Sequence, residues 1–315
     1  MNNSFIETIR AYYFNHFDEL DTSHQFHFAS RMAAWSGDQE AYKKLLGLKQ
    51  AFVTPPDNLS QSEYIANLIS EPQKGRRVAQ ELRAPYFILY PDLYGLEKAL
   101  FRVRHLKYIY DVDLKEVFLS VYPLAKIATL KQSLLSDPQS LRFLSSFAVN
   151  MFYVSEIVLD HQSPKATPEF WYEVGLHYDM TSIEQVQLLI YLYTHCIIAD
   201  SHFYIRSIPE DHIATYNKML SHLEAVIDAQ FEHISLDNKL EYLVATKIIR
   251  FSTKLADRIY YECRQSISTK GNFIIERHNQ NLRPDRQTFI KSEHRNVLLI
   301  MSGSDFSPHN TLATD

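Results

Sequence analysis

Apolar side chains recur along most of the chain with the spacing of one helix face. Between residues 5 and 20, Ile9, Tyr13 and Phe17 fall on one side of a helix, whereas Glu7 and Arg10 fall on the other. A period of about 3.6 residues is typical of an amphipathic α-helix that buries one face. The pattern therefore predicts a first helix over residues 5–20.

Capping residues and prolines mark many further helix starts. Ser60 followed by Glu63 fits a capping box, in which two orphan backbone amides are satisfied reciprocally. Pro138 and Pro168 stand where a first-turn proline loses no hydrogen bond. Helices are predicted over 23–35, 38–52, 60–70, 75–84, 91–110, 113–135, 138–160, 168–178, 182–200, 209–231, 236–250, 253–268 and 293–302.

One stretch lacks the helical period. Residues 270–292 are polar and irregular, and within them Phe273–Ile275 and Gln287–Ile290 could pair as a short hairpin. The tail 303–315, rich in small and polar residues, is expected to be disordered. We therefore predict an all-α fold with an irregular or hairpin insertion near 270–292.

Glycine scarcity supports this fold class and excludes common enzyme classes. The chain has seven glycines, about a third of the usual number for 315 residues. Phosphate-binding loops and the nucleophile elbow of α/β-hydrolases need closely spaced glycines, and neither motif is present. No repeat period is visible, so antiparallel helix pairs are expected.

The loop at 161–168 is the best candidate for a domain boundary. Its sequence, HQSPKATP, interrupts the helical pattern. It would separate an N-terminal helical lobe, 1–160, from a C-terminal helical lobe, 168–302. Because the loop is short, the two lobes are expected to pack together.

Composition indicates a globular protein of the cytoplasm. The chain is 46% hydrophobic and 22% charged, with a net charge of −5. Two cysteines, Cys196 and Cys263, cannot form a disulfide framework, and the first ten residues do not resemble a signal peptide. The longest apolar run, 186–199, is shorter than the roughly 18 residues of a membrane span. We expect a cytoplasmic protein without membrane insertion.

Positive charge is concentrated in two segments. Residues 74–107 contain eight Lys or Arg against three acids, and residues 270–295 contain six against three. Two solvated basic faces would explain this, and so would an anionic ligand or partner. Basic and aromatic residues interleave over 98–110, as RNA stacking requires, but an amphipathic helix with a basic outer face suffices. Nucleic-acid binding ranks lowest because the remainder of the chain is acidic.

The C-terminal part resembles α/α-toroid proteins. A turn at Gly271 and Phe273 leads through a polar excursion to a helix start at Ser292. The segments 194–204 and 235–245 are similar in style to the inner helices of such barrels. The resemblance covers residues 170–302 and implies a toroid-like or solenoid-like arrangement, with polar residues around a central cavity. The Asp-rich motifs of terpene cyclases and the zinc ligands of lanthionine cyclases are absent, so neither chemistry is implied.

His195, Asp200 and His202 are the candidate catalytic residues. They lie at the end of the predicted helix 182–200, where Asp200 could orient either imidazole as a general base. His177 precedes the same helix, so His177, His195 and His202 could also ligate a metal. The spacing matches no metal signature, and buried, hydrogen-bonded histidines would explain the same pattern. No metal or cofactor is therefore specified.

Lys291, Glu293, His294, Arg295 and Asn296 form the candidate ligand-binding cluster. They surround the start of the predicted helix 293–302, where free amides and the helix dipole attract a phosphate or carboxylate. These residues could instead simply cap the helix. Asp237 and Glu241, one turn apart, are read as a solvated acidic face.

Two functions are consistent with these patterns. The first is a scaffold that binds a protein, a peptide or a small anionic ligand. The alternative is an enzyme with a His/Asp-containing site in the cavity of the C-terminal lobe. The enzyme hypothesis requires the two residue clusters to meet around one pocket.

Overall fold

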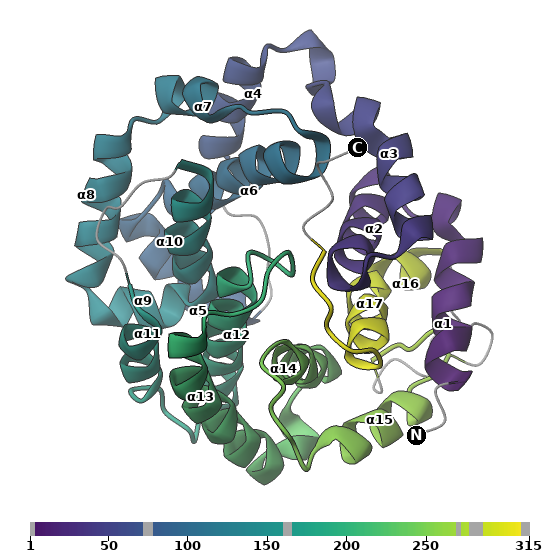
Figure 1. Cartoon of the computed structure of the whole chain (residues 1–315). Coiled ribbons are helices and arrows are strands. Elements are labelled where there is room, and N and C mark those ends of the chain that lie inside the picture. Colours follow the sequence, from purple (N-terminus) through teal and green to yellow (C-terminus); the bar gives the residue numbers. More distant parts are fainter. Residues whose placement is uncertain (1–3, 72–77, 160–165, 269–271, 277–285, 310–315) are drawn as a thin grey trace. The chain divides into compact units, whose positions relative to one another are not determined.

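The computed structural model describes residues 4–71, 78–159, 166–268, 272–276 and 286–309 (Figure 1). Within these ranges the all-α prediction is confirmed, because they contain 17 α-helices, three short 3-10 helices and no strand. Extended backbone pairs there only at an isolated antiparallel bridge between Ile267 and Ile274. The loop 161–165, Gly271 and residues 277–285 lie outside the described residues.

The chain forms its helices in the following order. They are α1 (Ser4–Asn15), α2 (Thr22–Ser36), α3 (Gln39–Val53), α4 (Gln61–Ile69), α5 (Val78–Leu89), α6 (Leu93–Tyr110), α7 (Lys115–Val121), α8 (Leu124–Leu135), α9 (Pro138–Leu144), α10 (Ser146–Leu159), α11 (Pro168–Gly175), α12 (Ile183–Asp200), α13 (Glu210–Ala229), α14 (Leu236–Ile248), α15 (Ala256–Gln265), α16 (Arg286–Lys291) and α17 (Glu293–Ser302).

Two predicted helices are each divided in the structure. The predicted helix 113–135 breaks between α7 and α8, where Tyr122 and Pro123 are extended and Pro123 becomes the N-cap of α8. The predicted helix 138–160 bends by 93° between α9 and α10. At that bend Ser145 has a positive φ of 46°, and its hydroxyl donates to the carbonyl of Leu188 on α12. A proline therefore sets the first break, whereas a contact with a distant helix accompanies the second.

Pro85 does not end a helix, although the sequence predicts that the helix over 75–84 ends just before it. Pro85 lies inside α5, which continues to Leu89. An interior proline removes one backbone hydrogen bond. Packing on α9 compensates, because the ring of Tyr86 stacks on Phe143 at 4.6 Å and Nε of Arg83 donates to the Phe143 carbonyl.

The prediction of a hairpin within 270–292 is wrong. Gln287–Ile290 belongs to helix α16, and Ile274 pairs instead with Ile267. The ring of Phe289 stacks on Tyr13 at 4.7 Å, which anchors α16 on α1. Apolar packing on another element thus overrides the strand-like composition.

Contact density divides the chain into two compact units. Unit 1 comprises Met1–Leu48, Tyr204–Ser207 and Leu220–Asn310, and unit 2 comprises Lys49–Phe203, Ile208–Met219 and Thr311–Asp315. The boundary falls within α3 and within α13. The proposed lobe boundary at 161–168 stays a prediction.

Helix α10 is the centre of unit 2. It packs against α6 and α12, while α6 also packs against α4, and α12 against α11. Of the 14 residues of α10, 11 are buried. A helix that is apolar on nearly every side must be covered by neighbours on nearly every side.

Helix α17 has the same role in unit 1. It packs against α1, α2, α14 and α16, and α14 packs in turn against α15 (Figure 1). Eight of its ten residues are buried. Three of these are the polar residues Glu293, Asn296 and Ser302.

We expect Gly95→Ala to destabilise the protein by about 2 kcal/mol or more, because overpacking at backbone contacts is costly. A Cβ at position 95 on α6 would lie 2.2 Å from the carbonyl oxygen of Ile69 at the end of α4. Gly47→Ala is the matched control, since a Cβ there meets nothing within 4 Å. The control should gain about 0.5–1 kcal/mol from helix propensity. Urea denaturation measures both, and equal effects would contradict the prediction.

Candidate functional site

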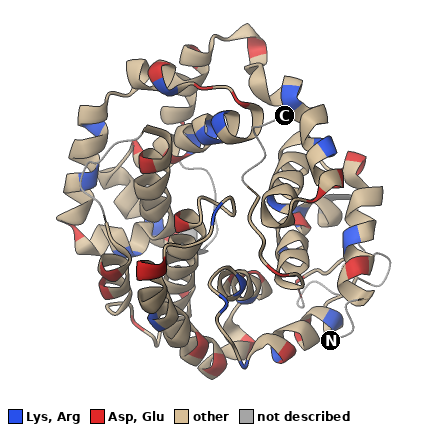
Figure 2. Ribbon diagram, viewed as in Figure 1, with Lys and Arg blue, Asp and Glu red and all other residues tan. Residues whose placement is uncertain are grey.

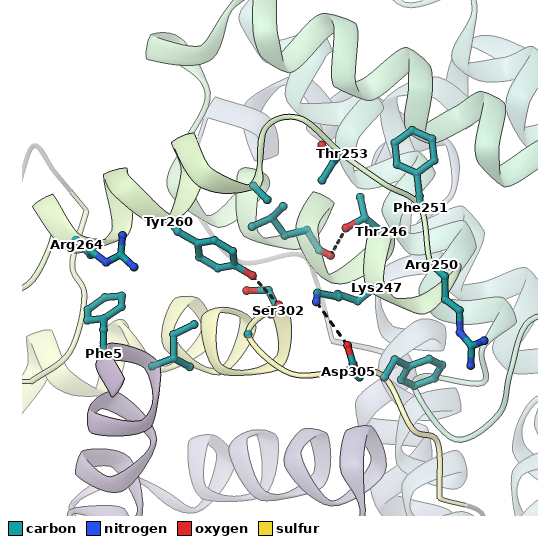
Figure 3. A pocket seen from close by; sticks show the side chains of 15 residues that line it. Phe5, Thr246, Lys247, Arg250, Phe251, Thr253, Tyr260, Arg264, Ser302 and Asp305 are labelled. Atoms are coloured by element: carbon teal, nitrogen blue, oxygen red, sulfur yellow. Dashed lines mark hydrogen bonds and ion pairs between the residues drawn. The ribbon is translucent and has the colours of Figure 1, made fainter. Parts of the chain in front are cut away.

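A cavity of about 700 Å³ lies within unit 1. Its walls come from the start of α1, the second half of α14, the connection after it, α15, and the end of α17 (Figure 3). Three cations line it, Lys247, Arg250 and Arg264, against a single acid, Asp305. We call this space the α14–α15 cavity.

The three cations differ in their partners. Nζ of Lys247 lies 3.8 Å from Oδ1 of Asp305, whose side chain is fully exposed. Arg264 lies 5.8 Å from the centre of the Phe5 ring. Within the described part of the chain, neither Arg250 nor Arg264 forms a hydrogen bond or an ion pair with an acid. Both arginines are exposed, so the cavity carries two solvated guanidinium groups that have no acidic partner among the described residues.

Hydroxyl groups in the cavity are already engaged as donors. The Tyr260 hydroxyl donates to the Ser302 carbonyl at 2.6 Å, and the Thr246 hydroxyl donates to the Leu243 carbonyl at 2.7 Å (Figure 3). The aromatic rings of Phe5, Phe251 and Tyr260 add apolar lining. A ligand therefore meets apolar surface and cationic groups.

The segment after α17 completes one wall of the cavity. Asp305 and Phe306 line it. The segment is fixed by Trp35 of α2, whose indole N–H donates to Oγ of Ser304 and whose carbonyl accepts from the amide of Ser307, both at 3.0 Å. Residues 304–309 belong to the tail expected to be disordered, and 310–315 lie outside the described residues.

Asp200 pairs with His212, which is not among the predicted site residues. Its Oδ2 lies 2.6 Å from Nδ1 of His212, near the start of α13, and accepts a hydrogen bond from the Tyr216 hydroxyl at 3.0 Å. Asp200 is buried and His212 is partly exposed. Asp200 thus pairs with a histidine of the following helix, and its expected pairing with His195 or His202 stays a prediction.

His195 belongs to a different polar group. Its Nδ1 lies 3.0 Å from Oδ1 of Asn150, whose amide donates to Oε1 of Glu97 at 2.6 Å. Burial raises the pKa of Glu97 to about 7, and the hydrogen bond from Asn150 and the charge of Arg83 offset this only in part. Asn150 therefore bridges α6 and α12 through two polar side chains.

The backbone carbonyls of His202 and His177 each accept a hydrogen bond from an arginine. The carbonyl of His202 accepts from Nη2 of Arg104 at 2.6 Å, and His202 has a positive φ of 51°. The carbonyl of His177 accepts from Arg142, and its exposed side chain lines a separate cavity of about 390 Å³. In the described ranges no three His, Cys, Asp or Glu residues are placed to hold a metal ion. The metal-ligating role considered for His177, His195 and His202 gains no support from this geometry and stays a prediction.

Four of the five residues predicted to bind a ligand at the start of α17 contact other parts of unit 1. The Glu293 carboxylate lies 2.7 Å from Nδ1 of His27, and His294 Nε2 lies 3.4 Å from Oε1 of Glu241. Arg295 forms ion pairs with Asp237 and Glu276 at 2.7 and 2.6 Å. Asp237 and Glu241 are thus partners of α17 rather than a solvated face.

Asn296 and Lys291 complete this cluster. The Asn296 side chain bonds both backbone groups of Ile274, at 2.8 and 2.9 Å, whereas Lys291 is exposed. Burial raises the pKa of Glu293 to about 7 and lowers that of His27 well below its ordinary value. None of the five predicted residues lines the α14–α15 cavity. Their ligand-binding role stays a prediction.

Aromatic rings of unit 2 contact basic residues of α6, and Figure 2 marks the lysines and arginines in blue. Lys98 lies 4.5 Å from the centre of the Tyr94 ring, Arg102 lies 5.0 Å from that of Tyr64, and Arg104 lies 4.7 Å from that of Phe203. Such cation–π contacts stabilise the fold internally. Lys74, Arg76 and Arg77 of the first basic segment lie outside the described residues.

Comparisons with protein-family models, with curated proteins and with solved structures each returned no match. Among the described helices, none alone has the length and apolar character of a membrane span. The bent pair α9 and α10 meets both criteria only when the two are taken together.

Sequence patterns missed the cavity cations for a physical reason. Lys247 lies in the last turn of α14 and Arg264 in the last turn of α15. Basic residues are common there because they complement the negative end of the helix dipole. The available signal was the presence of basic residues at the ends of two successive helices, α14 and α15.

We expect Glu97→Gln to stabilise the protein more at about pH 8 than at about pH 5, since a buried carboxyl with a raised pKa takes up a proton on folding. The rise from 4.5 to about 7 corresponds to at most about 3 kcal/mol of stability lost as Glu97 ionises. Urea unfolding at both pH values measures the difference. Glu116→Gln, at an exposed position, is the control and should show none. An equal effect of Glu97→Gln at both pH values would contradict the pKa.

Proposed function

We propose that the protein binds a small organic anion in the α14–α15 cavity. The observation that carries the proposal is the pair of guanidinium groups, Arg250 and Arg264, which line the cavity without an acidic partner in the described part of the chain. A cavity of about 700 Å³ falls within the usual range of small-molecule sites, roughly 300–1,000 Å³. Among the partners considered from the sequence, a small anion fits better than a protein surface.

The backbone conformation of Arg250 supports a binding role for this residue. Arg250 has a φ of 57° at the left-handed position that ends α14, where the amide of Phe251 donates to the Thr246 carbonyl at 2.8 Å. Glycine and asparagine are favoured there, because a larger side chain costs about 1–2 kcal/mol. Strained backbone positions often occur at binding sites, and the strain at Arg250 is consistent with such a role.

The remaining sequence hypotheses belong to the same proposal. We propose that the protein acts in the cytoplasm, which the free, buried thiols of Cys196 and Cys263 support. The helices between residues 170 and 302 would follow the toroid-like arrangement that the sequence resembles, and the absence of a strand from the described residues of this range supports it. Nucleic acid and membranes are not among the proposed partners.

Binding of anions tests the proposal directly. We expect phosphate, citrate or nucleotides to raise the melting temperature of the wild-type protein, because a ligand that binds only the folded state stabilises it. The double variant Arg250→Gln, Arg264→Gln should lose this shift, whereas Lys43→Gln, at an exposed position outside the cavity, should keep it. Retention of the shift by the double variant would place the anion elsewhere.

Arg250→Gly separates binding from folding. We expect it to raise the free energy of unfolding by about 1 kcal/mol, because glycine adopts a left-handed conformation without strain. The same change should weaken anion binding, since it removes one of the two uncompensated cations. Denaturation and calorimetric titration of one preparation measure both quantities. A loss of stability, or unchanged binding, would oppose a binding role for this strained arginine.

A further inference from the structure

Charge is distributed unevenly along the α14–α15 cavity. In Figure 3, Arg264 and Arg250 lie on opposite sides of the view, and Lys247 and Tyr260 lie between them. The two guanidinium groups therefore lie at opposite ends of the cavity lining. One is carried by α15, and the other by the connection after α14.

The middle of the cavity is closer to neutral than its ends. Lys247 faces the carboxylate of Asp305 at 3.8 Å, which reduces its attraction for a second anion. Arg250 and Arg264 have no such acid in the described residues. The unbalanced positive charge is therefore at the two ends.

Apart from Lys247, which is next to Asp305, the surface between the two arginines offers few hydrogen-bond donors. The ring of Tyr260 lies in this region (Figure 3), and the Tyr260 and Thr246 hydroxyls donate to backbone carbonyls. An apolar chain or ring can lie against such a surface without leaving polar groups unpaired. A polar middle section would lose hydrogen bonds to water there and gain few in return.

From this arrangement we infer that the ligand is an elongated dianion, with one carboxylate or phosphate at each end and an apolar section between them. The inference rests on the proposed function and specifies its ligand class. Each terminal anion forms a charge-assisted, two-pronged contact with one arginine, the geometry in which guanidinium groups bind such anions best. The apolar section sets the distance between the two contacts, so the cavity selects ligands by length.

A series of paired ligands tests the inference by isothermal titration calorimetry. The wild-type protein is titrated with the α,ω-dicarboxylates from succinate to dodecanedioate and with the monomethyl ester of each. We expect affinity to peak at one chain length, where the diacid binds about tenfold more tightly than its ester, the usual effect of one charge-assisted contact. The ester has nearly the same length and apolar area, so the ratio isolates the second anionic group.

Single variants then show whether each arginine holds one end. Arg250→Gln and Arg264→Gln should each reduce the preference for the diacid over its ester to about twofold or less. Lys43→Gln should leave the preference unchanged. Circular dichroism and melting temperature confirm that each variant is folded, and the ester affinity of the same variant shows that the cavity is intact.

The outcomes distinguish this inference from the proposed function. Diacids and esters that bind alike, or a preference that depends on one arginine only, would overturn the elongated dianion and leave anion binding standing. Binding of compact anions such as phosphate, with no diacid bound, would overturn it as well. A protein that binds no diacid, ester, phosphate, citrate or nucleotide would overturn the proposed function itself.

Discussion

The short helix α17 is surrounded by α1, α2, α14 and α16, and a helix enclosed in this way must have its polar groups satisfied by those neighbours. The carboxylate of Glu293 is met by His27, and the amide of Asn296 holds both backbone groups of Ile274. At the opposite end, the Ser302 carbonyl accepts from Tyr260 of α15. Unit 1 is therefore organised by the need to satisfy one buried helix.

The α14–α15 cavity follows from this organisation. The end of α17 contributes Ser302 and Gly303 to its wall, and the segment beyond them returns across Trp35 to add Asp305 and Phe306. Cations at the ends of α14 and α15 complement helix dipoles, yet two of the three cavity cations lack an acidic neighbour among the described residues. A basic residue can complement the helix dipole and also bind a ligand. The first effect depends only on its place near the end of the helix, whereas the second depends on a guanidinium group that is free to contact the anion.

Unit 2 uses its polar residues differently. Asn150 connects Glu97 with His195, Asp200 connects His212 with Tyr216, and aromatic rings contact cations of α6. The hydrogen bonds among them are buried or partly buried and join α6, α10, α12 and α13. Hydrogen bonds and cation–π contacts of this kind stabilise helix packing.

Local patterns in the sequence were enough to determine the helical class and many helix bounds, because periodicity and capping act within a few residues. The Ser60–Glu63 capping box forms as expected, and the predicted helix 293–302 coincides with α17. Tertiary structure decided the bend at Ser145, the continuation of α5 through Pro85 and the helix at Phe289, since in each case packing on a distant element outweighs local preference. It also decided that Asp200 pairs with His212, and that Arg250 and Arg264 share a cavity. Which side chains meet across separate helices depends on how those helices pack, and no local spacing encodes that.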